Sequence, residues 1–182
     1  MSVFIAMLRG INVTGHGIIK MDALREMCVG LKLRDVRTHI QSGNVIFRTA
    51  PTEEAALAKK IQAGIEKAFG LRPEVILRST REVRAVVEAN PFTGRANIEP
   101  GKLLVLFLGV RPSAEVRSKI EALRPDPEEL HLIGRELYIY FPDGQGRSKF
   151  VPVLDRILKS TGTGRNWNSV TKMLAIAEEL EG

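Results

Sequence analysis

The sequence contains few residues of the types that build disulfide frameworks, metal centres or base-stacking surfaces. Its 182 residues include one cysteine, Cys28, three histidines and 5% aromatic residues. A single cysteine excludes an intrachain disulfide and a cysteine-rich zinc site, and it fits a reducing compartment. His16, His39 and His131 have neither metal-like spacing nor adjacent acids. We therefore predict no metal site and no bound cofactor.

Long apolar segments are also missing. No apolar run reaches the roughly 18–20 residues that a membrane span needs. Met1–Gly10 lacks the basic start and long apolar stretch of a signal peptide, because its short apolar run ends at Arg9. The 44% hydrophobic and 26% charged content is that of a globular protein. We expect a cytoplasmic protein of one large or two small domains.

Positive charge is concentrated in the first half. The net charge is +6, and residues 1–78 hold 12 Lys and Arg against 7 Asp and Glu, a net of +5. Such a half can attract phosphates, nucleic acid or acidic partners. The charges of both signs are interspersed, which fits a solvated, arginine-rich surface equally well.

The hydrophobic periodicity of the chain repeats once and indicates an α+β protein built from two related units. Residues 1–79 follow the order strand, helix, strand, strand, helix, strand, and residues 102–182 follow the order strand, helix, strand, strand, helix, helix. Residues 80–101 form a connecting helix and loop. This order predicts two ferredoxin-like subdomains (split βαβ, or α/β-plait) packed together, the second with an extra C-terminal helix.

Both faces of two predicted strands are apolar. Val3–Leu8 and Leu103–Leu108 carry apolar side chains at every position. A lone unit of this type covers only one face of its sheet with helices, so the second face needs a cover. We expect the two units to pack against each other within the chain, with homodimerisation as the alternative.

Three loops rich in Gly and Arg are the candidate binding segments. The first, residues 9–17, is a near miss to a phosphate-binding loop, because His16-Gly17 stands where Lys-Ser/Thr is required. The second is residues 143–149, and the third, residues 161–169, carries the only tryptophan. Loops that enter helices can present N–H groups to an anion. The candidate contacts are Arg9, Asn12, Arg147, Ser148, Arg165 and Asn166. Glycine turns, helix caps and arginine–acid pairs explain the same residues structurally.

Catalytic patterns are weak. Cys28 lies on the apolar face of a predicted helix, which is typical of an inert core thiol. No Gly-x-Ser-x-Gly motif is present, and nothing identifies a nucleophile or base, so the question of enzymatic activity stays open. The leading hypothesis is binding of a phosphorylated or anionic small molecule. The alternative is a nucleic-acid or protein-interaction module that uses the basic N-terminal subdomain. Val3–Leu8 is similar to the first strand of RNA recognition modules, but Phe47 is the only aromatic of the matching third strand.

Short motifs along nearly the whole chain resemble a bacterial family called domain of unknown function 1697. They are Arg9-Gly10-Ile11-Asn12-Val13, Met21 with Leu24-Arg25, Val36-Arg37-Thr38, residues 41–47, Asn90-Pro91-Phe92, Tyr138 with residues 142–144 and 146–148, and Arg165-Asn166-Trp167-Asn168. The resemblance implies an α+β protein of two ferredoxin-like subdomains and implies no activity. Thr161–Gly164 departs from the family's usual run of threonines, and His39 stands where a tyrosine is common.

Overall fold

The structure is a computed structural model, and it describes residues 1–13, 15, 17–159 and 162–182. Two compact units make up the chain: Met1–Ala85 with Thr171–Gly182, and Val86–Val170. No helix among the described residues is long and apolar enough to cross a membrane. Thr14, His16 and Thr161 of the predicted loops lie outside the described residues.

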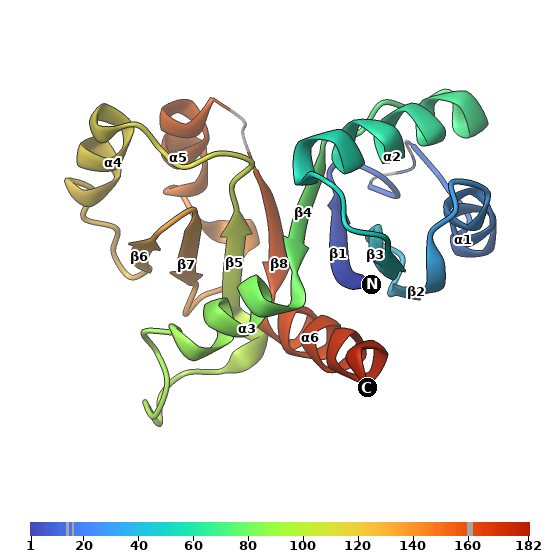
Figure 1. The fold of residues 1–182 in the computed structure, drawn as a ribbon. Helices are drawn as coiled ribbons and strands as arrows, with labels where there is room; N and C mark the ends of the chain where they lie inside the picture. The colour runs from blue at the N-terminus through green and yellow to red at the C-terminus, as the bar shows by residue number, and fades with distance from the viewer. Residues whose placement is uncertain (14, 16, 160–161) are drawn as a thin grey trace. The chain divides into compact units, whose positions relative to one another are not determined.

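The first unit is a four-stranded antiparallel sheet with two helices packed on one face (Figure 1). Its elements are β1 (Ser2–Leu8), α1 (Met21–Gly30), β2 (Arg34–His39), β3 (Asn44–Thr49), α2 (Glu54–Phe69), β4 (Val75–Ser79) and the start of α3 (Thr80–Glu88). The strand order is β2-β3-β1-β4, so the apolar strand β1 lies between two neighbours. Strand β1 therefore has no open edge.

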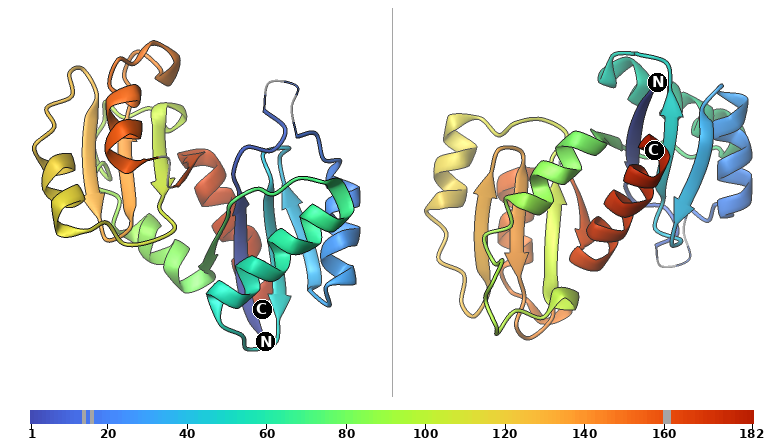
Figure 2. Two further views of the ribbon diagram at one scale, coloured as in Figure 1. Left: turned by 90° about the horizontal axis from the view of Figure 1, so that it is seen from above. Right: turned by 60° about the horizontal axis from the view of Figure 1, so that its bottom comes forward.

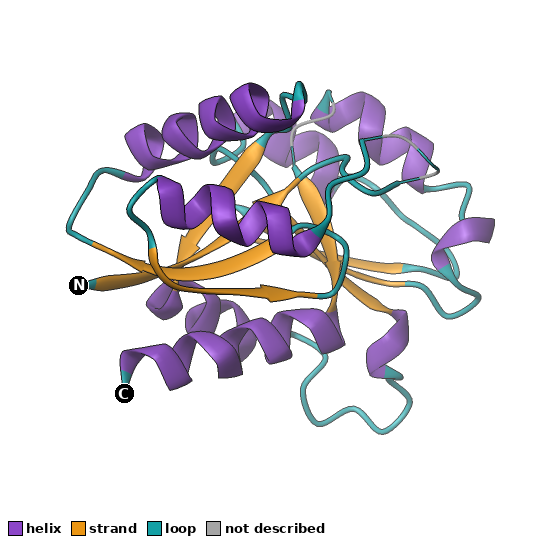
Figure 3. Cartoon of the chain, turned by 90° about the vertical axis from the view of Figure 1, so that its right-hand side faces the viewer, coloured by secondary structure: helices purple, strands orange, loops and turns teal. Residues whose placement is uncertain are grey.

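The C-terminal helix covers the second face of this sheet. Helices α1 and α2 pack on the face that carries Ala6, Leu8 and Phe47. The opposite face carries Val3, Ile5 and other side chains that are at most 3% exposed. The last turns of α6 (Trp167–Glu181) belong to this unit and lie on the side away from α1 and α2 (Figure 3). Ion pairs hold them, with Arg37 Nη1 at 2.7 Å from Glu179 and Arg84 Nε at 3.0 Å from Glu178.

The second unit repeats the same order of strands. Its elements are the end of α3, β5 (Leu103–Phe107), α4 (Ala114–Glu121), β6 (Glu129–Ile133), β7 (Glu136–Tyr140), α5 (Val151–Leu158), β8 (Thr163–Asn166) and the first turn of α6. The antiparallel sheet has the order β6-β7-β5-β8. Strand β8 corrects our prediction, which placed these residues in a loop. It pairs with β5, with Val105 opposite Arg165.

Different segments cover the two faces of the second sheet. Helices α4 and α5 pack on the face that includes Leu137 and Ile139. On the other face, the Tyr138 hydroxyl donates to the carbonyl oxygen of Val86 at 2.7 Å. The ring of Phe92 meets His131 edge-on, with the ring centroids 5.3 Å apart. Figure 2 shows α3 and α5 on opposite sides of the strands.

Helices of the same chain therefore cover both second faces. We expected the two units to pack against each other; the division of the chain shows that α6 begins in the second unit and ends in the first, and that α3 does the reverse. The boundaries predicted from the order of elements, 79/80 and 101/102, differ from the compact division at 85/86 and 170/171 for this reason. A sequence pattern shows where a helix lies along the chain but not which sheet it packs against.

Candidate functional site

Two adjoining hollows lie at one end of the second sheet. Glu129 of β6 is paired with Tyr140 of β7. The strands are antiparallel, so the segment before β6 and the segment after β7 leave the sheet at the same end. These two segments line both hollows.

The larger hollow has a volume of about 510 Å³. Its lining combines apolar and charged side chains: Leu123, Arg124, Pro125, Asp126, Pro127, Glu128, Arg147, Lys149, Phe150 and Val153. Three cations face two carboxylates, which leaves a formal charge of +1. Val153 is 40% exposed, whereas Phe150 is buried at 8% exposure. The hollow therefore offers both charge and an apolar wall.

The smaller hollow, of about 170 Å³, is formed by the segment after β7. Gly144 has a φ of 85° and is followed by a single 3₁₀ turn, Gln145–Arg147. Ser148 then prepares the start of α5, because its Oγ accepts from the N–H of Phe150 at 3.1 Å. Arg147 and Ser148 both line this hollow. They are the two predicted contacts that the structure brings together in a cavity.

Arg165 and Asn166 do not line either hollow. The Arg165 guanidinium is buried and donates to Thr163 Oγ1 at 2.7 Å and to the Gly164 carbonyl oxygen at 2.9 Å. Burial lowers the pKa of Arg165 to about 10. Asn166 Oδ1 accepts from the N–H of Asn168 at 3.0 Å, and its Nδ2 donates to the Gly101 carbonyl oxygen at 2.8 Å. Asn166 therefore acts as a cap at the start of α6.

Arg9 and Asn12 belong to the other unit. Arg9 Nη1 lies 3.4 Å from Glu74, and both side chains are about two-fifths exposed. Asn12 Nδ2 donates to the carbonyl oxygens of Ile19 and Gln41, and its Oδ1 accepts from the Ile19 N–H. The amide of Asn12 thus organises the loop from within.

The sequence did not single out Arg124 or Phe150, whereas Lys149 belongs to the second candidate loop, residues 143–149, although not to the six candidate contacts. Arg124 follows α4 and begins the segment Arg124-Pro125-Asp126-Pro127, whose prolines indicate a fixed turn. Its Nη1 donates to the carbonyl oxygens of Glu121 and Leu123. Two prolines beside an arginine were the available signal, and they do not identify a binding site by themselves.

No group of His, Cys, Asp and Glu among the described residues has the arrangement of a metal site. His131 Nε2 lies 3.2 Å from Glu129, whose carboxylate also binds Arg95 at 2.7 Å. Burial and the nearby charge of Lys172 lower the pKa of His39. His39 and His131 belong to different units, and each has its own set of neighbours.

Cys28 is buried in the core of the first unit, and burial raises the pKa of its thiol from 9.0 to about 12. The unfolded chain loses this proton at lower pH than the folded protein. The contribution of the protonated Cys28 thiol to the free energy of unfolding is therefore complete below pH 9 and is lost as the pH rises toward 12. We expect a loss of about 1.4 kcal/mol per pH unit across this window. Denaturant titrations should show a shallower alkaline loss in Cys28→Ala; equal slopes would contradict the prediction.

Comparisons with protein families and with solved structures identify relatives of this chain. The family model described as "Protein of unknown function (DUF1697)" matches residues 1–138. The chain belongs to this family. A search among curated proteins finds no match. The structure is similar to that of the conserved bacterial protein SP0830 from Streptococcus pneumoniae, with a TM-score of 0.79 and 22% identity over 98% of this chain and 99% of that one. This likeness shows the shared fold alone.

Proposed function

We propose that this DUF1697 protein binds a small anionic molecule, through a phosphate or carboxylate group, in the hollows beside Arg147. The observation that carries the proposal is that two cations of the lining are not paired with an acid. Arg147 and Lys149 lie in the lining of the larger hollow. Within the described residues, neither side chain has a hydrogen bond or an ion pair to an acid.

The charge of the lining favours a small anion over a polyanion. Asp126 and Glu128 offset two of the three positive charges around the larger hollow. A phosphate or carboxylate needs contact with only one or two cations, whereas a nucleic acid contacts many. The apolar wall at Phe150 and Val153 suits a small molecule with an apolar part beside its charged group.

The proposed site is narrower than the set of residues that the sequence indicated. Ser148 Oγ serves the start of α5, and the amides of Asn12 and Asn166 bind backbone groups. Arg165 is buried among backbone and side-chain oxygens. Of the six predicted residues, the side chain of Arg147 is the best placed to contact a ligand.

The first unit provides less support for nucleic-acid binding. Several of its arginines are paired with acids, including Arg37 with Glu179 and Arg48 with Asp35. Phe47 is fully buried under the helices. The sheet face that carries Ile5 is buried as well. We infer that this half of the chain chiefly supports the fold.

The order of elements supports a finer description of both units. Each has the order β-α-β-β-α-β, and in each the first strand pairs with the third and the fourth. We infer that both are ferredoxin-like subdomains, since this is the connectivity of a split βαβ sandwich.

The test is binding of inorganic phosphate, pyrophosphate, sugar phosphates and nucleotides, measured by thermal shift and titration calorimetry. We expect Arg147→Ala to weaken binding of the best anion at least tenfold, or about 1.4 kcal/mol. Arg111→Ala is the matched control, because Arg111 lies in the loop between β5 and α4 at the opposite end of the sheet. Equal affinity in Arg147→Ala, or no binding of any anion to the wild-type protein, would refute the site.

A further inference from the structure

Strand β6 is an open edge of the second sheet. It is terminal in the order β6-β7-β5-β8, and within the described residues it pairs with β7 alone, without a bulge. Every second residue of such a strand directs its N–H and carbonyl groups to the unpaired side. The strand has no lysine, arginine or proline, the residues that commonly protect an edge. Its backbone is therefore open to pairing with a further extended segment.

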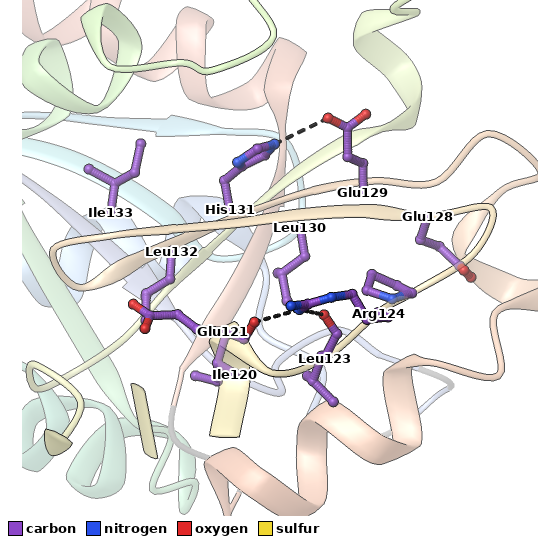
Figure 4. A pocket seen from close by; sticks show the side chains of 11 residues that line it. Ile120, Glu121, Leu123, Arg124, Glu128, Glu129, Leu130, His131, Leu132 and Ile133 are labelled. Atoms are coloured by element: carbon purple, nitrogen blue, oxygen red, sulfur yellow. Dashed lines mark hydrogen bonds and ion pairs between the residues drawn. The ribbon is translucent and has the colours of Figure 1, made fainter. Parts of the chain in front are cut away.

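A hollow of about 500 Å³, the edge hollow, runs along β6 beside the end of α4. All five residues of β6 line it. Figure 4 shows Leu130 and Leu132 pointing toward Leu123, whereas Ile133 points to the other side of the strand. Because side chains from both sides of the strand line the edge hollow, it follows the unpaired backbone and offers apolar contact along it.

The edge hollow adjoins the larger hollow of the proposed anion site. Both are lined by Leu123, Arg124, Pro125 and Glu128, which belong to the segment before β6. Together the two hollows form a path from the start of β6 to Ile133 at its end. Five residues of a strand span about 17 Å, so the path suits an extended segment of about five or six residues.

Positive charge lies at one end of this path. The larger hollow, at the start of β6, has a formal excess of one positive charge. Two of its cations, Arg147 and Lys149, have no ion pair to an acid within the described residues. A phosphate monoester carries nearly two negative charges at neutral pH, whereas a carboxylate carries one. The excess of one charge therefore matches a carboxylate better.

Along the rest of the path, acidic side chains are already paired. Glu129 lies 2.7 Å from Arg95, and Glu121 lies 3.2 Å from Arg117. The remaining side chains of β6 are two leucines, one isoleucine and one histidine. This part of the path therefore suits an uncharged and partly apolar segment.

Building on the anion-binding function proposed above, on which this inference rests, we propose that the anion is the C-terminal carboxylate of another polypeptide. The carboxylate contacts Arg147 and Lys149, and the preceding residues add to β6 as a strand. With the carboxylate at the start of β6, the chain runs toward Ile133, so the added strand is antiparallel, like its neighbours. Backbone hydrogen bonds supply affinity, and alternate side chains contact the edge hollow. Ile133 is 40% exposed, so the partner chain can continue beyond it.

The first test compares a free and a blocked carboxylate by titration calorimetry. Two acetylated hexapeptides, Thr-Val-Thr-Leu-Thr-Val and Val-Thr-Leu-Thr-Val-Thr, cover both alternations of apolar residues. We expect the better peptide to bind at least about tenfold more tightly as the free acid than as the C-terminal amide. Arg147→Ala should remove this preference, and Arg111→Ala should preserve it. Binding of neither peptide, or equal binding of the acid and the amide, would overturn the proposal.

The second test examines the backbone of the peptide. In an added strand, alternate N–H groups face β6 and the others face solvent. Two forms of the better peptide, N-methylated at alternate positions in the two possible registers, should therefore differ at least about tenfold in affinity. Equal losses in both forms would rule out strand pairing. A decapeptide with the same last six residues should bind as tightly as the hexapeptide; weaker binding would contradict a protein C-terminus as the ligand.

The third test separates this inference from the anion site itself. Ile133→Glu should weaken binding of the peptide at least about fivefold, since it removes an apolar contact at the far end of the path. Val29→Glu, at an exposed apolar position of the first unit, is the matched control. Binding of inorganic phosphate should be the same in both variants. Phosphate binding that depends on Arg147, without peptide binding, would leave the anion site standing and overturn the peptide; binding of neither would refute both.

Discussion

Replacement of Asn12 by aspartate is expected to destabilise the first unit by about 3 kcal/mol, because two donated hydrogen bonds are lost inside a loop. Nδ2 donates to the carbonyl oxygen of Gln41 at 2.7 Å and to that of Ile19 at 3.1 Å. An aspartate oxygen at the same place would face both carbonyl oxygens as a third acceptor. Only the bond from the Ile19 N–H, at 2.7 Å, would survive.

The backbone makes this substitution a clean test. Asn12 has a φ of 53°, a left-handed conformation that both Asn and Asp adopt readily. The change in the free energy of unfolding, measured with urea, therefore reports on the side-chain hydrogen bonds. Asn97→Asp is the control, because Asn97 is exposed and its side chain makes no hydrogen bond within the described part of the chain.

The result decides between two roles for Asn12. A loss near the expected size assigns the amide to the loop, as its three hydrogen bonds indicate. If Asn12→Asp destabilised the protein as little as Asn97→Asp, the result would contradict this role and return Asn12 to the candidate ligand contacts. Anion binding by the second unit should be the same in both variants.

The sequence predicts the α+β class and most elements, because local signals for them are strong. Strand β1 is apolar at consecutive positions, and the hairpin between β6 and β7 has Gly134 with a φ of 63° at its turn. Two helix caps are also local: Ser113 Oγ accepts from the N–H of Val116 at 3.2 Å, and Ser79 Oγ accepts from that of Glu82 at 3.3 Å. In each case the residues that decide the structure are close in sequence.

Strand β8 was missed because its buried positions are polar. Thr163 and Arg165 face inward with 5% and 7% exposure, while the intervening Gly164 lies against Leu104. A sequence of Thr-Gly-Arg-Asn has the alternation of a strand but not its hydrophobicity. Only pairing with β5, about 60 residues earlier in the sequence, reveals it.

The candidate site was predicted only in part, for a related reason. Asn12, Ser148 and Asn166 have side chains that suit a ligand, but in the structure those side chains bind the protein's own backbone. Such hydrogen bonds compete with ligand binding, and the sequence does not distinguish the two uses. Arg124 was overlooked because it faces Arg147 only through the antiparallel pairing of β6 and β7.

Substitution of Gly43 by alanine is expected to destabilise the first unit by roughly 3 kcal/mol, through left-handed backbone strain and overlap in the core. Gly43 has a φ of 75°, and a Cβ at this position would lie 2.6 Å from Ile11 Cδ1 and 2.9 Å from Leu8 Cβ. The Gly43 carbonyl oxygen also accepts from the Leu8 N–H at 2.9 Å, so the turn cannot move away freely. Here the segments 9–13 and 41–47 pack against each other.

A double-mutant cycle separates the overlap from the strain. Ile11→Ala removes the two nearest atoms of Ile11 and should by itself cost about 2–4 kcal/mol, since the side chain is 3% exposed. If the methyl group introduced by Gly43→Ala occupies the space that Ile11 leaves, the double variant should be more stable than the sum of the two single effects, by about 1–2 kcal/mol. The strain at φ 75° and the contact with Leu8 should remain. Additive effects in urea unfolding would mean that the backbone, and not the packing of Ile11, requires glycine at this turn.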